Sequence, residues 1–263
     1  MPPLTRLSNS DRLRQIIVAI AIVVAFAINV WSNLSPINGE TIGEISNNVF
    51  GDVLITPANY AFIIWGVIYL GLFSFAAYQL RPAQRQNPRL RRSAYWLVVA
   101  CLAQTAWVFL FLTRQFVGSL LVMVVILLSL IALYLGLGIG TERTSAEERL
   151  RLQLPISIYL GWISVATVVN VAIALVSLGW NGWGISPRGW TAILIVVAAL
   201  IGIGVLLTRG DTAYGAVFIW AILAIGVRQA GRPWILGTAI AAAIILAVLV
   251  ARNWRMGFPA HSP

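Results

Sequence analysis

Charged side chains are scarce in this sequence of 263 residues, and lysine is absent from it altogether. Only 10% of the residues are charged, whereas roughly 25% is usual for a soluble globular domain. All 18 basic residues are arginines, set against 8 Asp and Glu. So little charge cannot cover the water-facing surface of a chain that is 60% hydrophobic, with a mean hydropathy of +0.89. The composition excludes an ordinary soluble protein and indicates a membrane protein.

Residues that bind metals or act as nucleophiles are equally rare. Cys101 is the only cysteine, which excludes an intrachain disulfide and a thiolate metal cluster. His261 is the only histidine and lies in a polar tail, which excludes a haem iron held by a histidine of the core. The few carboxylates lie almost entirely between apolar segments, which argues against carboxylate metal cages and paired-carboxylate catalysis. We therefore predict no metal site and no conventional enzyme active site.

Apolar segments of about 20 residues recur along the chain, and each is long enough for a helix that crosses a bilayer. We predict an all-α, polytopic transmembrane bundle of about eight spans. The first segment follows Arg12 and Arg14, but it is long for a signal peptide and lacks a small-residue cleavage site, so we interpret it as a retained span. The predicted spans cover residues 15–33, 58–79, 93–113, 116–138, 155–179, 189–208, 212–229 and 233–252.

The arginines are distributed unevenly between the two ends of these spans. Only Arg114, Arg188, Arg228 and Arg232 fall on the side opposite the N-terminus, and the other fourteen fall on the same side as it. The positive-inside rule then predicts a protein of the cell membrane with both termini in the cytoplasm, which requires an even number of spans. Arginines between apolar segments suit anionic lipid headgroups, so we expect the bilayer as a partner and not nucleic acid.

The longest external segment runs from about residue 34 to residue 57, between the first two spans. It contains Glu40, Glu44 and Asp52 together with Pro36 and three glycines. A long ordered loop between spans is often a lid or a binding element. A solvated connector is an equally good interpretation of the sequence alone.

Aromatic residues form stripes in three of the spans. Six of the 11 tryptophans stand at predicted span ends, where anchoring at the headgroups explains them. Trp65, Trp107 and Trp162 lie inside spans and share helical faces with tyrosine, phenylalanine and a few polar residues at spacings of three and four. Aromatic walls with few polar groups are typical of a site for a flat, apolar ligand, but on spacing alone helix packing with amide bonds between helices is the favoured interpretation. The stripes are Phe62, Trp65, Tyr69 and Phe73; Gln104, Trp107 and Phe111; and Tyr159, Trp162, Ala166 and Asn170.

The segments that carry these stripes resemble the TspO/MBR family of tryptophan-rich sensory proteins and translocator proteins. Residues 159–170, YLGWISVATVVN, resemble the family's fifth-helix pattern Y-L-x-W-x-x-x-A-T-x-x-N. Residues 56–69, TPANYAFIIWGVIY, are similar to its second helix, and Gln104 to Phe111 to its third, in the family's order. Two departures concern the pocket: the first loop keeps a single proline, Pro57, with Tyr60 in place of Trp, and Gln104 stands where the family has Asn.

The resemblance implies a five-helix bundle whose pocket opens toward the long loop. Family members bind porphyrins and haem, some bind sterols, and many are dimers. It divides this chain into a cytoplasmic segment (1–14), a TspO-like core (15–180), a three-helix extension (181–254) and a tail (255–263). Arg114, near the loop, is the expected rim cation for ligand propionates. The implied ligand-binding residues are Tyr60, Phe62, Trp65, Tyr69, Gln104, Trp107, Phe111, Tyr159, Trp162, Ala166 and Asn170.

The function expected from the resemblance is a sensor or carrier that binds a tetrapyrrole, with no cofactor required. A secondary transporter is an alternative, although transporters usually carry ionisable residues in mid-span and we find none there. A porphyrin-degrading membrane enzyme is a second alternative, because photo-oxidation of a bound porphyrin needs only stacked tryptophans. Asp211, near a predicted span end, is expected to cap a helix or to pair with Arg209.

Overall fold

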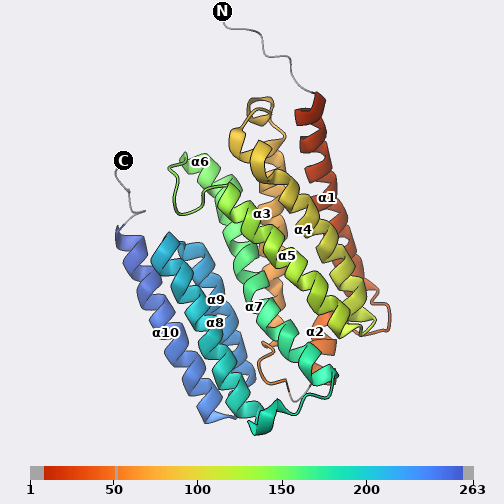
Figure 1. Cartoon of the computed structure of the whole chain (residues 1–263), viewed down its shortest axis with the longest axis vertical. Helices are drawn as coiled ribbons and strands as arrows, with labels where there is room; N and C mark the ends of the chain where they lie inside the picture. The colour runs from red at the N-terminus through yellow and green to blue at the C-terminus, as the bar shows by residue number, and fades with distance from the viewer. Residues whose placement is uncertain (1–8, 51–52, 257–263) are drawn as a thin grey trace, which may run out of the picture.

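Two groups of long helices stand side by side in the computed structural model, which describes residues 9–50 and 53–256 (Figure 1). One group is a five-helix core; α9 and α8 pack beside it on α7, and α10 packs on α8 and α9. Every regular element of the described residues is helical, which confirms the all-α fold. The core helices are α1 (Asn9–Leu34), α3 (Ile64–Gln79), α4 (Pro88–Leu112), α5 (Phe116–Gly136) and α7 (Leu154–Ser177); the others are α8 (Pro187–Arg209), α9 (Thr212–Arg228) and α10 (Pro233–Met256).

Seven of these helices are long and apolar enough to cross a membrane. The eighth, α9, has 17 residues and a length of about 25 Å, which is short for a span, but it runs beside α8 and α10 (Figure 1). The chain is therefore a multi-pass membrane protein. Because α1 begins at the end of the bundle where α10 finishes, we call this the inner end and the opposite one the outer end.

The start of α4 differs from the prediction, which placed it at residue 93. The helix begins at Pro88, because the Asn87 side chain caps it by accepting a hydrogen bond from the backbone N–H of Arg89 at 3.0 Å. Hydropathy misses the start of this helix because three of its first five residues are arginines. This part of the helix therefore projects from the apolar part of the bundle into the inner polar layer.

The segment between α1 and α3, residues 35–58, is called the outer loop here, and its described part is folded. It contains α2 (Ile42–Glu44) and a π-helical turn (Ile45–Val49), and a 3-10 helix (Asn59–Ile63) follows it. The Thr41 hydroxyl accepts from the Glu44 N–H at 3.3 Å, and the Glu44 carboxylate accepts from the Thr41 N–H at 2.7 Å. The Thr41 hydroxyl also donates to this carboxylate at 2.8 Å, and the two bonds that the carboxylate accepts from Thr41 lower the pKa of Glu44. The described part of the loop is therefore an ordered element, and its role as a lid or binding element stays a prediction.

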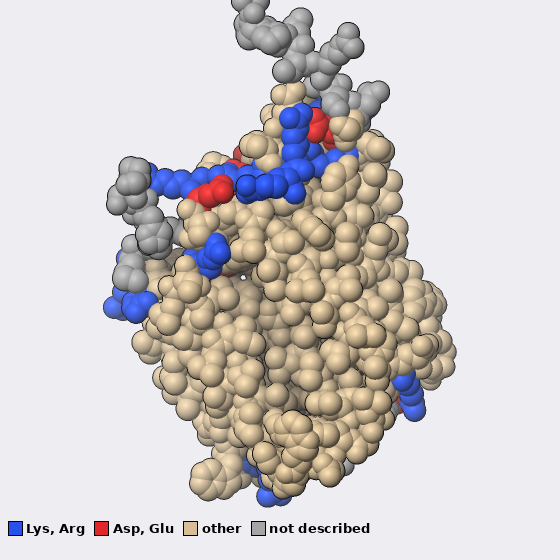
Figure 2. All heavy atoms as spheres, viewed as in Figure 1, with Lys and Arg blue, Asp and Glu red and all other residues tan. Residues whose placement is uncertain are grey.

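The two ends of the bundle differ in charge, as Figure 2 shows: arginines crowd the inner end, and an uncharged belt lies below them. Among the described arginines, only Arg114, Arg188, Arg228 and Arg232 lie at the outer end. Arg6, Asp52 and His261 lie outside the described residues. The observed asymmetry matches the predicted one, and the assignment of the inner end to the cytoplasm is a proposal based on it.

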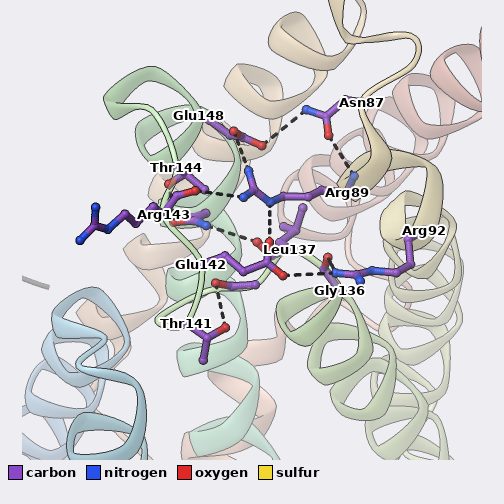
Figure 3. Close-up of polar contacts among 12 residues, drawn as sticks. Asn87, Arg89, Arg92, Gly136, Leu137, Thr141, Glu142, Arg143, Thr144 and Glu148 are labelled. Carbon is purple, nitrogen blue, oxygen red and sulfur yellow. Dashed lines mark hydrogen bonds and ion pairs between the residues drawn. The ribbon is translucent and has the colours of Figure 1, made fainter. Parts of the chain in front are cut away.

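Two of the arginines at the inner end, Arg89 and Arg92, bind the connection between α5 and α7. Arg89 donates from Nε to Glu142 at 2.9 Å, from Nη1 to Glu148 at 2.9 Å and from Nη2 to the carbonyl of Arg143 at 3.0 Å (Figure 3). Arg92 lies 3.7 Å from Glu142 and donates to the carbonyl of Gly136 at 2.7 Å. Arg89 and Glu148 are partly buried, whereas Arg92 and Glu142 are exposed. Because the pairs share partners, they act as a network that joins the start of α4 to the α5–α7 connection.

Asp211 connects the extension to the core. It caps α9 by accepting from the N–H groups of Ala213 and Tyr214, both at 3.1 Å. Its second oxygen accepts from Tyr134 of α5 at 3.0 Å and from Ser157 of α7 at 2.6 Å. Burial raises the pKa of Asp211, and these four hydrogen bonds oppose the rise. Of the two predicted roles the cap is confirmed, and no ion pair joins Asp211 to an arginine within the described residues.

Candidate functional site

A cavity of about 50 Å³ lies in the outer half of the core, beneath the outer loop. Three tryptophans reach it from three helices: Trp65 from α3, Trp107 from α4 and Trp162 from α7. The outer loop covers it with Ile42, Ser46 and Pro57. The remaining lining residues are mostly apolar, namely Phe62, Phe111, Met123, Val165, Ala166, Val169, Asn170 and Ile173.

The aromatic rings around the cavity support one another through edge and stacked contacts. The ring of Phe62 meets Trp162 edge-on with centroids 5.9 Å apart, and Trp107 stacks on Phe111 at 4.9 Å. Such pairs contribute about 0.5–1.5 kcal/mol each beyond the burial of their area. The aromatic wall is therefore held in place by its own contacts before any ligand arrives.

Asn170 is the polar residue of the wall, and it bonds across helices. Its Oδ1 accepts from the indole N–H of Trp107 at 2.8 Å, and its Nδ2 donates to the Ser119 hydroxyl at 3.1 Å. Ser119 in turn donates to the backbone carbonyl of Phe116 at 2.8 Å. One amide thus ties α7 to α4 and α5. Asn170 therefore lines the cavity, as a ligand site would require, and also joins helices, as the helix-packing interpretation predicts.

The structure brings seven of the eleven predicted ligand-binding residues together at this cavity. The seven are Phe62, Trp65, Trp107, Phe111, Trp162, Ala166 and Asn170. Of the other four, Tyr69, Gln104 and Tyr159 lie one helical turn deeper toward the inner end, below the cavity floor. Helical periodicity identifies the face of a helix, but it does not say how far along that face a cavity extends.

Each of the four remaining residues has a different environment. Tyr60 is 45% exposed and meets Trp220 of α9 edge-on at 5.3 Å. Tyr69 donates to the carbonyl of Ala25 in α1 at 3.0 Å. Tyr159 is buried against Trp65. Gln104 is 1% exposed, and neither of its amide atoms has a hydrogen-bond partner within the described residues.

Several lining residues were missed by the sequence analysis. The loop residues Ile42 and Ser46 carry no aromatic or charged signal, and Met123 of α5 lies in a uniformly apolar segment. The Met123 thioether is the only sulfur among the lining residues, and no histidine or cysteine lies there. A haem iron would therefore find only a weak, soft ligand at this site.

Arg114, the predicted rim cation, lies in the turn between α4 and α5. Its guanidinium pairs with Glu40 of the outer loop at 2.6 Å, and it does not line the cavity. Beside it, the Asn38 side chain donates to the carbonyl of Leu112 at 3.0 Å. The turn between α4 and α5 therefore fastens one side of the outer loop.

The other side of the outer loop is fastened by α9. Arg228 donates to the Thr56 hydroxyl, in a short contact, and to the carbonyl of Asn47 at 3.0 Å. Gln229 donates to the carbonyl of Leu54 at 2.9 Å. Sequence analysis could not find these contacts, because they join residues more than 170 positions apart. The extension thus holds the loop that covers the cavity.

A second hollow, of about 580 Å³, lies between the ends of α7 and α8 and the loop residues Val53 to Ile55. Trp180, Trp183 and Trp190 cluster there with centroids 4.9–6.2 Å apart. The indole N–H of Trp190 donates to the carbonyl of Gly182 at 2.8 Å, so this cluster is bonded internally. The predicted role of these tryptophans, anchoring at the headgroups, fits their place at the outer end.

The comparisons with known proteins agree with this architecture. The sequence model of a family described as TSPO-like protein matches residues 15–252. The chain belongs to the TSPO-like protein family. The match runs through α8, α9 and into α10, so the TSPO-like region includes the extension as well as the five-helix core. No curated protein and no solved structure matches the chain.

Proposed function

We propose that this TSPO-like membrane protein binds a tetrapyrrole, or a similarly flat and apolar ligand, in its aromatic cavity and acts as a sensor or carrier. The observation that carries the proposal is the convergence of Trp65, Trp107 and Trp162 on one cavity. A flat, rigid ligand loses little conformational entropy when it stacks on such rings.

The size of the cavity adds a condition to this proposal. Ligand sites for molecules of this class have volumes of roughly 300–1,000 Å³, whereas this cavity has about 50 Å³. A tetrapyrrole therefore requires the cavity to expand. The amide of Asn170 ties the wall helices α4, α5 and α7 together, so we take displacement of the outer loop as the route of expansion.

The polar chemistry of the lining supports binding in preference to catalysis. The Ser46 hydroxyl donates to the carbonyl of Ile42 at 2.7 Å, and Asn170 bonds to Trp107 and Ser119. No base accompanies either group among the lining residues. With Met123 as the only soft ligand, binding should depend on the porphyrin ring and little on iron. The homodimer implied by the family resemblance stays a prediction.

The test is titration of the purified protein in detergent with protoporphyrin IX, haem and a sterol, followed by tryptophan fluorescence. Trp162→Ala removes one cavity wall, whereas Trp183→Ala removes a 78%-exposed ring outside the cavity and is the control. We expect saturable quenching by protoporphyrin and haem with similar affinities, weakened in Trp162→Ala alone. Equal affinity in both variants, or no saturable quenching in the unaltered protein, would reject the proposed site.

A further inference from the structure

We propose that Arg228 of α9 recognises a carboxylate of the ligand, and that its transfer from the outer loop to this carboxylate releases the loop and lets the cavity expand. This inference rests on the proposed function and deepens it, because it gives the ligand class as a flat, apolar molecule that carries a carboxylate. It also gives the extension helices a role in binding.

Arg228 does not itself line the cavity, but it contacts two outer-loop residues that are next in sequence to lining residues. It holds two limbs of the outer loop together, since one terminal nitrogen bonds to Thr56 and the other to Asn47. Thr56 directly precedes Pro57, and Asn47 directly follows Ser46; both neighbours line the cavity. A ligand group that reaches out between these two limbs would therefore meet the guanidinium.

The acceptors that Arg228 uses in the structure are neutral ones, a hydroxyl and a backbone carbonyl. A planar guanidinium matches a carboxylate in a bidentate pair, and charge-assisted bonds of this kind are roughly twice as strong as neutral ones. A ligand carboxylate would thus be a better partner for Arg228 than the loop is. Arg114 differs in this respect, because Glu40 already supplies it with a carboxylate at 2.6 Å.

The hydrogen bonds of the loop allow this exchange. When Arg228 leaves, Thr56 keeps the bond from its hydroxyl to the carbonyl of Val53 at 3.0 Å. The loop also remains attached through Gln229 and through the Ala58 N–H, which donates to the carbonyl of Ala224 at 3.1 Å. The two limbs would separate while their ends stay anchored. Arg228 therefore keeps the two limbs together until a carboxylate replaces its loop acceptors, and a neutral ligand of the same shape would not release them.

The experiment compares protoporphyrin IX with its dimethyl ester, which has the same ring without free carboxylates. Binding of each is measured from the shift of the porphyrin absorbance in the purified full-length protein. The variants are Arg228→Gln, Arg228→Lys, Arg114→Gln and the control Arg188→Gln, which removes the same charge at the same end of the molecule. Retained helical circular dichroism shows that each variant is folded.

We expect the unaltered protein and Arg188→Gln to bind the diacid about tenfold or more tightly than the ester. Arg228→Gln should lose this preference, because it should bind the diacid more weakly than the unaltered protein does. It should bind the ester at least as well as the unaltered protein, because Arg228 no longer holds the limbs of the loop together. Arg228→Lys should keep part of the preference. An unchanged preference in Arg228→Gln, or its loss in Arg114→Gln instead, would overturn the inference.

A failure of the proposed function would give a different result. If neither porphyrin binds the unaltered protein, the aromatic cavity is not a tetrapyrrole site. If both bind the unaltered protein equally well and Trp162→Ala weakens both, the cavity is the site but Arg228 does not select a carboxylate.

Discussion

The indole N–H of Trp107 donates to Asn170 Oδ1 at 2.8 Å, and this bond joins α4 to α7 at the wall of the cavity. We predict a measurable coupling between the two residues in a double-mutant cycle of Trp107→Phe and Asn170→Leu. Hydrogen bonds between membrane helices contribute roughly 0.6 kcal/mol on average and about 1.7 kcal/mol at most. The measurement is reversible unfolding in mixed micelles, and strictly additive effects would show that the bond contributes nothing.

The helices and their order can be predicted from the sequence, because the hydropathy of a span and the arginines that flank it lie in one short stretch of consecutive residues. The sequence also identifies the faces on which Trp65, Trp107 and Trp162 meet, since helical periodicity places residues on a face. It does not place Tyr69 relative to the cavity, because the depth of the cavity within the bundle depends on how the loops close over the helices. The contact of Arg228 with Thr56 could not be predicted either, as it depends on how α9 packs against a loop 172 positions away.

Gln104 is a buried amide whose two polar atoms lack partners within the described residues. We predict that Gln104→Met, which has a similar shape, raises the free energy of unfolding by about 1 kcal/mol or more. The reason is that an unsatisfied buried polar group costs about 1–3 kcal/mol. Gln229→Met is the control and should lower stability, because that amide donates to Leu54 and accepts from Arg232. A loss of stability in Gln104→Met would show that its amide is satisfied in the membrane.

Asp211 should make stability depend on pH in a defined direction. Its pKa in the folded protein is raised above the ordinary value of 3.8, so its contribution is fully present below that value and is lost as pH rises through the raised pKa. Asp211→Asn cannot ionise. We expect the thermal stability of the unaltered protein, relative to Asp211→Asn, to fall over the pH range that starts near the ordinary value of 3.8 and extends upward through the raised pKa. Melting curves whose difference stays constant across this range would contradict the prediction.

The orientation of the bundle can be tested with single cysteines, since Cys101 is buried. Ala83 at the inner end and Ala230 at the outer end are both exposed. If the inner end is cytoplasmic, a membrane-impermeant maleimide should label Ala230→Cys in intact cells and Ala83→Cys only after permeabilisation. Labelling in the opposite order would reverse the proposed topology.

Filling the aromatic cavity tests the proposed ligand site most directly. Ala166 lines the cavity on α7, whereas Ala106 on α4 is exposed on the outside of the bundle, so Ala166→Phe and Ala106→Phe add the same group in the two places. The measurement is the dissociation constant of protoporphyrin IX, obtained from the shift of its absorbance. We expect Ala166→Phe to weaken binding at least tenfold, about 1.4 kcal/mol, and Ala106→Phe to leave it unchanged. Equal affinities in both variants would contradict binding in this cavity.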